Sequence, residues 1–190
     1  QLIGYYPVSD VTELMARMVA SGRLHATTLP SDLAAADVIT INVETPVDEM
    51  HVPRYEALRA ACHHLGPVLA TGALVIVEST VAPGTIDDVV RPILEETSGR
   101  AANQGFLLAV CPERVMPGRL LSNLRHMSRV IGGSSAEAEG LAVAFYRCFV
   151  QGELDSADCL TAELVKTTEN AYRDVQIAFA NEVALICEAL

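Results

Sequence analysis

The sequence predicts an α/β fold in which helices cover both faces of a parallel sheet. Short segments that are apolar throughout alternate along the chain with longer amphipathic segments, and polar or turn residues directly follow three of the apolar segments. Continuous apolar runs are typical of parallel strands buried on both faces, whereas segments with helical spacing are typical of the covering helices. Together these patterns indicate an open α/β sheet.

Four apolar runs are the expected strands. They are residues 38–43 (VITINV), 74–77 (LVIV), 106–110 (FLLAV) and 129–131. Thr45-Pro46 follows the first run and Gly132-Gly133 follows the last. Since Gly and Pro commonly interrupt regular structure, these residues set the expected ends of the strands.

Five segments with helical spacing separate or follow the strands. They are residues 11–20, 54–65, 86–96, 136–149 and about 158–190. The last segment contains no Gly or Pro, and as a helix of roughly 30 residues it would be on the order of 45 Å long. Helices in compact domains are usually shorter. We therefore expect a sheet domain at 1–157, with 158–190 forming the first long helix of a separate, helical domain.

The composition excludes several classes of partner. The chain has 190 residues, of which 51% are hydrophobic, 24 are acidic and 13 are basic, so its net charge is −11. This apolar content argues against disorder. The acid excess argues against nucleic acid or an anionic membrane as the partner, because Lys and Arg neutralise phosphates. No apolar run reaches the roughly 18 residues that a membrane span requires.

Cysteine and histidine usage points to a cytoplasmic protein without a metal site. The number of cysteines is odd and none forms a CxxC pair, so buried thiols in a reducing cytosol are favoured over disulfides or zinc. The cysteines are Cys62, Cys111, Cys148, Cys159 and Cys187. No histidines stand at metal-ligand spacing. The chain starts with Gln1 and shows no signal-peptide pattern, so we expect an excised or incomplete part of a longer protein.

Candidate functional groups stand directly after the expected strands, as Glu44-Thr45-Pro46, Glu78-Ser79-Thr80 and Pro112-Glu113-Arg114. Open α/β sheets bind ligands at the carboxyl ends of their strands. The hydroxyls at 79–80 could cap the following helix or contact a phosphate. Glu113 could act as a base, the alternative being a surface turn with an ordinary salt bridge. Cys111 has no His nearby in the sequence and is interpreted as a structural thiol.

A polar stripe lies along the final helical segment. It consists of Glu163, Lys166, Asn170 and Arg173. Their spacing places them on one helix face within about 80° of arc. A solvated polar face is one interpretation. The other is a binding surface for a phosphorylated or polyhydroxyl ligand, because Arg can pair with phosphate through two nitrogens and Lys supplies a compact charge.

Several motifs together resemble one known family. They are EST at 78–80 with PGT at 83–85, CPERVMPG at 111–118, RVIGG at 129–133 and TAELVKTTENAYRDVQIAFANEVALIC at 161–187. Over residues 11–190 the chain is similar to the NAD-dependent UDP-glucose/GDP-mannose dehydrogenases. The resemblance implies a partial Rossmann-like domain followed by a helical dimerisation domain. It also implies an NAD-dependent UDP-sugar 6-dehydrogenase, which oxidises a C6 alcohol to a carboxylate in two hydride transfers during the synthesis of surface polysaccharide precursors.

The resemblance assigns roles by motif position. Thr45 and Thr80 would contact NAD, and Arg114 and Val115 would contact the UDP-sugar. Lys166, Asn170 and Arg173 would hold the sugar, with Lys166 and Asn170 stabilising the oxyanion. Glu113 would assist the water that hydrolyses a thioester intermediate.

The family pattern also has parts that this sequence lacks. They are the glycine-rich loop, the nucleophilic Cys and the carboxyl-terminal domain, so the isolated chain is expected to be inactive. The style of CPERVMPG and TTENAYRDV favours UDP-N-acetyl-D-mannosamine as the substrate over UDP-glucose, UDP-N-acetylglucosamine or GDP-mannose. A homodimer through the long helix is expected, with Val175, Phe179, Val183 and Ile186 on its apolar face. The competing hypothesis is a non-catalytic binding or dimerisation module.

Overall fold

Five strands form one sheet in the order β1-β2-β3-β4-β5 in the computed structural model, which describes residues 8–115 and 119–190. The strands are β1 (Val38–Ile41), β2 (Leu74–Val77), β3 (Leu107–Val110), β4 (Arg129–Gly133) and β5 (Leu154–Asp158). The α-helices are α1 (Val8–Ala20), α2 (Glu56–Leu65), α3 (Arg91–Ser98), α4 (Leu120–His126), α5 (Ala136–Arg147) and α6 (Cys159–Ala189). Three shorter helical segments are η1 (Pro30–Ala35), η2 (Gly66–Val68) and η3 (Ile86–Val90), the last of which continues into α3.

The sheet is parallel except between β3 and β4, which are antiparallel. The prediction of an all-parallel sheet is therefore wrong at this pair. A parallel return needs a crossover, usually a helix, that carries the chain back along the sheet. Among the described residues between β3 and β4 the one helix is α4, of seven residues, and β4 then runs opposite to β3, with Gly132 paired to Val110 and Gly133 to Ala109.

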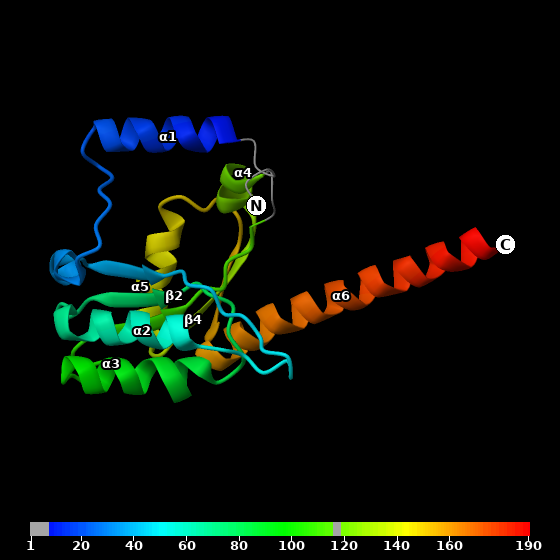
Figure 1. Ribbon diagram of the computed structural model, residues 1–190. Helices are drawn as coiled ribbons and strands as arrows, with labels where there is room; N and C mark the ends of the chain where they lie inside the picture. Colours follow the sequence, from blue (N-terminus) through cyan, green and yellow to red (C-terminus); the bar gives the residue numbers. More distant parts are fainter. Residues whose placement is uncertain (1–7, 116–118) are drawn as a thin grey trace.

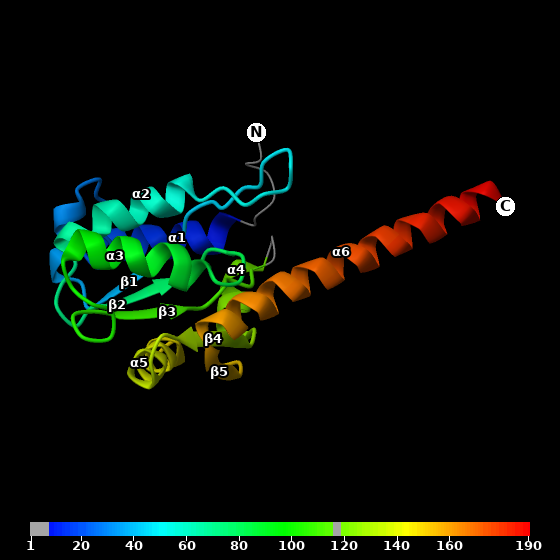
Figure 2. The same ribbon diagram turned by 90° about the horizontal axis from the view of Figure 1, so that it is seen from below.

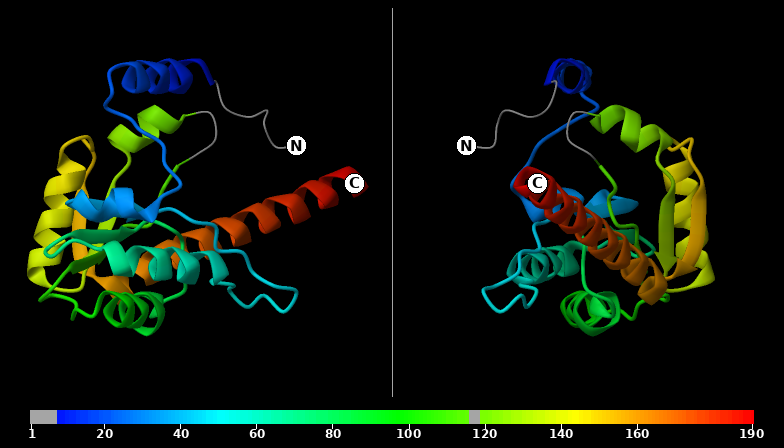
Figure 3. Two further views of the ribbon diagram at one scale, coloured as in Figure 1. Left: turned by 60° about the vertical axis from the view of Figure 1, so that its left-hand side comes forward. Right: turned by 90° about the vertical axis from the view of Figure 1, so that its right-hand side faces the viewer.

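Alternate residues of the central strands face two separate apolar layers. Val75 and Val77 belong to the core beneath α2 and α3, whereas Leu74 and Ile76 belong to the core beneath α5. Figure 2 shows α2 and α3 on one side of the sheet and α5 on the other, and Figure 3 shows the same separation from two further directions. All four residues of β2 are buried, as expected for a strand covered on both faces.

The fifth strand and α4 were not predicted from the sequence. β5 reads LDSAD and lies at the sheet edge, where none of its residues is fully buried. An edge strand needs little apolar content, so it leaves no hydrophobic run in the sequence. The four strands and five helices that were predicted are all present, with shifts of a few residues at their ends.

The glycines of the RVIGG motif allow close packing around β4. A Cβ on Gly132 would meet the carbonyl oxygen of Asp158 and the Cα of Cys159 at 2.7 Å, and one on Gly133 would meet the backbone nitrogen of Glu139 at 2.5 Å. The starts of α6 and α5 thus lie against β4 at distances that exclude a side chain.

Helix α6 starts against the sheet and then extends away from it. Its N-cap is Asp158, whose carboxylate accepts the N–H of Thr161 at 2.7 Å. The buried residues of α6 end at Glu163, and every residue from 168 onwards is exposed. With 31 residues the helix is about 46 Å long, and Figure 1 shows its far end well beyond the sheet. The division of the chain at 157/158 stays a prediction.

The cysteines are all free, and three of them are buried. Burial raises the pKa of Cys62 to about 11 and that of Cys159 to about 12. Cys111 is buried as expected, whereas Cys148 and Cys187 are exposed, so the expectation of buried thiols holds only in part.

Candidate functional site

The loops that follow β1 and β2 are tied together at the carboxyl edge of the sheet. The Ser79 hydroxyl accepts the N–H of Val43 at 2.9 Å and donates to its carbonyl at 2.7 Å. The Thr45 hydroxyl donates to the carbonyl of Thr80 at 2.6 Å. The two residues expected to contact NAD, Thr45 and Thr80, therefore lie side by side, each partly buried.

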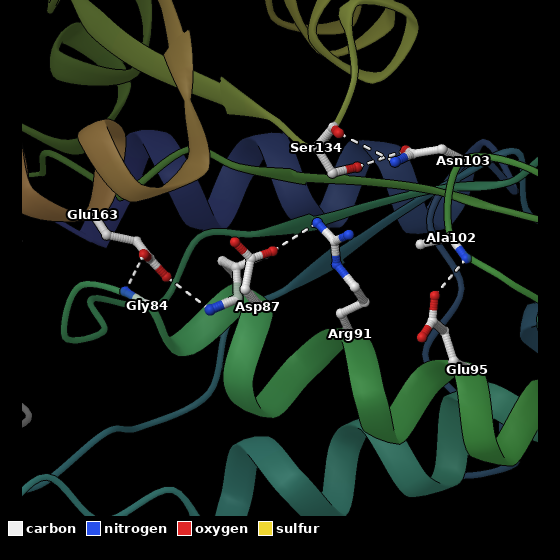
Figure 4. A network of polar contacts seen from close by, with 9 residues as sticks. Gly84, Asp87, Arg91, Glu95, Ala102, Asn103, Ser134 and Glu163 are labelled. Atoms are coloured by element: carbon white, nitrogen blue, oxygen red, sulfur yellow. Dashed lines mark hydrogen bonds and ion pairs between the residues drawn. The ribbon is translucent and has the colours of Figure 1, made fainter.

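A carboxylate of α6 binds the start of the helix that follows β2. Glu163 accepts the N–H of Gly84 at 2.6 Å and that of Ile86 at 2.8 Å, with one oxygen for each (Figure 4). The hydroxyls at 79–80 therefore do not cap this helix. Glu163 is only 1% exposed, so it does not belong to a solvated polar stripe, although its spacing with Lys166 suggested this.

A second group of charges forms where the segment after β3 meets α6. Arg114 pairs with Glu169 at 2.7 Å and donates to the carbonyl of Ser128 at 2.9 Å. Its side chain is only 14% exposed. Arg114 therefore joins this segment to α6 in a partly buried salt bridge. Of the alternative interpretation, a surface turn with an ordinary salt bridge, the salt bridge is present, but Arg114 is largely buried.

Lys166 and Glu113 influence each other's charge in this group. Burial lowers the pKa of Lys166, and the carboxylates of Glu169 and Glu113 raise it in part. Burial raises the pKa of Glu113, while the N–H of Val115 and the cations of Arg129 and Lys166 lower it. Among the described residues, the buried Glu113 Oε1 has no hydrogen-bond partner. The charges of Lys166 and Glu113 thus favour each other's ionised form, and the carboxylate of Glu113 is incompletely satisfied.

The remaining predicted residues lie further out. Val115 is partly buried at the end of the described segment, and residues 116–118 of the CPERVMPG motif lie outside the described residues. Asn170 and Arg173 are exposed on α6, beyond the part that packs on the sheet. Arg173 is nevertheless close enough for its positive charge to lower the pKa of Lys166. The structure therefore leaves Lys166 half-buried, where the charge of Glu113 influences it, and leaves Asn170 in solvent.

Sequence reasoning missed a buried polar network behind these loops. The Tyr146 hydroxyl on α5 donates to Oε1 of Glu78, the residue that follows β2. The guanidinium carbon of Arg129 lies 5.1 Å from the centre of the Tyr146 ring, and Arg129 is 2% exposed. Burial raises the pKa of the neighbouring Cys111 thiol, in keeping with a structural role. The one indication of this network in the sequence was Arg129, a charged residue at the first position of an otherwise apolar strand.

A groove of about 320 Å³ runs along the free side of β1 and reaches Val43, which is bonded to Ser79 at the carboxyl edge. It is lined by residues of β1, α2 and the segment at 27–33, including Thr28, Leu33, Ile39 and Leu65. None of the predicted site residues lines it.

Within residues 8–115 and 119–190, no group of three or more His, Cys, Asp or Glu side chains could hold a metal ion. In the same part of the chain, every helix is too short or too polar to cross a membrane.

Comparison with known families identifies the family of the chain. Residues 5–150 match the NAD binding domain of the UDP-glucose/GDP-mannose dehydrogenase family, and residues 160–190 match the central domain of the same family. The chain belongs to this family. Several UDP-glucose/GDP-mannose dehydrogenase relatives are similar over most of its length.

UDP-N-acetyl-D-mannosamine dehydrogenase of Pyrococcus horikoshii is 40% identical over 177 residues, covering 93% of this chain and 42% of the relative. NDP-N-acetyl-D-galactosaminuronic acid dehydrogenase of Ralstonia nicotianae is 37% identical over 187 residues, covering 95% of this chain and 44% of the relative. The chain thus spans less than half the length of these curated relatives.

Solved structures of the family show the same fold. The structure of UDP-D-ManNAc dehydrogenase from Pyrococcus horikoshii matches with a TM-score of 0.89 and 40% identity, covering 95% of this chain and 42% of that one. A ternary complex of GDP-mannose dehydrogenase from Pseudomonas aeruginosa matches with a TM-score of 0.87 and 26% identity, covering 93% and 41%.

The residues at the carboxyl edge fit one end of NAD, the cofactor of the matched domain. Thr45 and Thr80 present uncharged hydroxyls, which suit the amide and ribose hydroxyls of a nicotinamide nucleoside. The helix start after β2, which could otherwise bind a phosphate, is already occupied by Glu163. Uncharged hydroxyls at this edge are thus compatible with a nucleoside of NAD, although that of Thr45 already donates to the Thr80 carbonyl, and this helix start does not fit the pyrophosphate.

Proposed function

We propose that the chain is part of an NAD-dependent dehydrogenase that oxidises the C6 alcohol of UDP-N-acetyl-D-mannosamine to a carboxylate. The observation that carries the proposal is the hydrogen bond that ties Thr45 to Thr80 at the carboxyl edge of the sheet, together with the Arg114–Glu169 ion pair that joins the segment containing Glu113 to the helix containing Lys166. Similarity to UDP-N-acetyl-D-mannosamine dehydrogenases over 93% of the chain supports this choice of sugar.

Lys166 supplies positive charge where the substrate loses a proton. Bound NAD would supply the hydride acceptor, one NAD for each of the two transfers, while negative charge develops on the C6 oxygen as the hydroxyl loses its proton. An ammonium group in a partly buried position stabilises such an oxyanion more strongly than it would in water. Asn170 lies one turn further along α6 and can donate a second hydrogen bond. The positive charge of Arg173 favours the diphosphate of the substrate.

Glu113 activates the water that hydrolyses the thioester formed after the second hydride transfer and so releases the carboxylate; the thiol of that thioester belongs to a segment of the family pattern that this chain lacks. Its raised pKa makes the carboxylate a stronger base than an exposed glutamate, while the neighbouring cations oppose full neutralisation. Arg114 and Val115 hold the sugar nucleotide beside it. Because Arg114 is paired with Glu169, an anionic ligand must compete with that carboxylate for the guanidinium.

The test uses the full-length protein that contains this chain, with NADH formation as the readout. We expect turnover with UDP-N-acetyl-D-mannosamine and much less with UDP-glucose, UDP-N-acetylglucosamine or GDP-mannose. Lys166→Met should lower kcat by about 10²–10³-fold, the usual effect of removing one oxyanion stabiliser. Arg147→Met, which removes an exposed cation from the far end of α5, is the matched control. A preference for another nucleotide sugar would refute the proposed substrate. Full activity of Lys166→Met would refute the proposed role of Lys166.

We further propose that α6 pairs with the α6 of a second copy. Its far half exposes Val175 (66%), Phe179 (70%), Val183 (42%) and Ile186 (59%), and apolar side chains in such a row mark an interaction surface. Sedimentation of the full-length protein should show a dimer, and Phe179→Glu should dissociate it. A monomeric wild-type protein would refute this pairing.

A further inference from the structure

The contact between Glu163 and the loop after β2 is made by a buried carboxylate that has no cationic partner among the described residues. Each carboxylate oxygen accepts one backbone N–H, at 2.6 Å from Gly84 and 2.8 Å from Ile86. The nearby charges on η3, Asp87 and Asp88, are acidic and raise its pKa further, as burial already does. The two N–H groups and the positive end of the helix therefore provide the compensation that a buried carboxylate requires.

The same contact joins two parts of the proposed site. Thr80 lies in the loop that ends at Gly84, and Lys166 lies one helical turn after Glu163 on α6. Other hydrogen bonds of this loop point away from α6, since the Ala82 N–H and the Thr85 hydroxyl both donate to the Tyr55 hydroxyl. Among the described residues, the hydrogen bonds between this loop and α6 are the two that Glu163 accepts. Figure 4 shows the carboxylate between the helix and the loop.

We propose that Glu163 is a positioning residue that fixes the loop carrying Thr80 against the helix carrying Lys166, and thereby sets the cofactor against the substrate. The inference rests on the proposed function, in which Thr80 contacts the cofactor and Lys166 the substrate. Hydride transfer needs the reacting atoms about 3–3.5 Å apart, and a displacement of about 1 Å can lower the rate by about 10²-fold. A carboxylate that binds both parts directly is well placed to control that distance.

Two substitutions at Glu163 disturb the contact in different ways. Glu163→Gln keeps the size of the side chain, but its amide has one acceptor oxygen and places an NH2 group against the second N–H. Glu163→Asp keeps both oxygens and the charge, but one bond fewer retracts them by about 1.5 Å. The matched control is Glu96→Gln, which makes the same chemical change at an exposed residue of α3.

Kinetics of the full-length protein separate positioning from stability. With NAD and UDP-N-acetyl-D-mannosamine, both Glu163 variants should lose about 10–100-fold in kcat, with each KM within about threefold of wild type. Glu96→Gln should change neither constant. If the Glu163 variants melt at a lower temperature but keep the wild-type kcat when folded, Glu163 only stabilises the fold and the proposal is overturned.

Amide hydrogen exchange tests the contact without relying on activity. In wild type the amides of Gly84 and Ile86 should be protected, and in Glu163→Gln they should exchange at least tenfold faster, with no change in Glu96→Gln. If Glu163→Gln does not fold, wild type is titrated with acid instead. The amide NMR resonances of Gly84 and Ile86 should then shift with one common midpoint, because both amides donate to the Glu163 carboxylate. Equal exchange in all variants, or resonances that do not titrate together, would overturn the proposal. Absence of turnover in wild type would instead refute the proposed function. Amide hydrogen exchange at Gly84 and Ile86 would then test by itself whether Glu163 holds the loop against α6.

Discussion

Replacing Tyr146 by Phe should destabilise the chain, because it removes one hydroxyl and leaves the ring in place. Tyr146 is fully buried on α5, and its hydroxyl donates to the carboxylate of Glu78. The ring packs edge-on against Phe145 at 5.2 Å and lies 5.7 Å from Phe149, with Arg129 5.1 Å from its centre. A Phe ring keeps these contacts, so the substitution isolates the hydrogen bond.

The size of the effect follows from the partners of that bond. A hydrogen bond to an ionised group contributes about 1.5–3 kcal/mol net, and removing the donor leaves Glu78 short of a partner in a partly buried position. Burial raises the pKa of Tyr146 above its usual value near 10, so the hydroxyl keeps its proton at neutral pH. For a chain of this size, about 2–4 °C per kcal/mol gives a fall in Tm of about 3–12 °C.

Urea unfolding followed by circular dichroism measures the difference. Tyr172→Phe is the control, because Tyr172 is 65% exposed on α6 and the same atom is removed. We expect Tyr146→Phe to lose about 1.5–3 kcal/mol of unfolding free energy and Tyr172→Phe to stay within about 0.5 kcal/mol of wild type. If both variants unfold like wild type, the hydrogen bond from Tyr146 to Glu78 contributes nothing to the unfolding free energy and the reasoning is refuted.

Three further predictions concern the site and the packing around β4. The pKa of Glu113 is raised in the folded chain, so its contribution to stability is complete below the unfolded pKa, near 4.3, and is lost as the pH rises through the folded value. Glu113→Gln should therefore be more stable than wild type at pH 7, and urea titrations should show the difference shrinking on acidification; a constant difference would contradict this. Lys166 is the only lysine of the chain, so reductive ¹³C-methylation labels it and the terminal amine, and NMR titration should place its pKa below 10.5 and lower still in Glu113→Gln. Gly132→Ala should cost about 1–3 kcal/mol in urea unfolding, because the new Cβ would meet backbone atoms at 2.7 Å; unchanged stability would show that β4 and α6 can separate freely.

Periodicity predicted the parts of the fold that local residues determine. β2 and β3 are apolar throughout because both of their faces are covered, and the long helix lacks Gly and Pro, so these elements can be found in the sequence. The edge strand β5 and the reversal of β4 could not be predicted in this way. An edge strand needs few apolar residues, and the direction of a strand depends on how the connecting segment folds, which no residue pattern in β4 records.

The same distinction holds for the candidate site, where the positions of residues along the chain could be predicted but their burial could not. The positions of Thr45, Thr80 and Glu113 after their strands follow from the sequence, since strand ends can be read from the residues that interrupt them. For Glu163, spacing indicates a shared helix face with Lys166 but not whether that face is covered. The structure buries Glu163 and leaves Asn170 exposed, because α6 meets the sheet only through its first turns.

The sequence by itself determined which groups stand at the strand ends, and that a long helix carries Lys166 beyond the sheet. Only the tertiary structure decided which of these groups meet. Glu163 binds Gly84, which lies 79 residues earlier, and Tyr146 binds Glu78, which lies 68 residues earlier. Local patterns constrain residues within a turn or a strand of one another, whereas contacts across such separations depend on strand order and direction. Hydrophobic patterning leaves that order open, and the packing of α5 and α6 against β4 settles it.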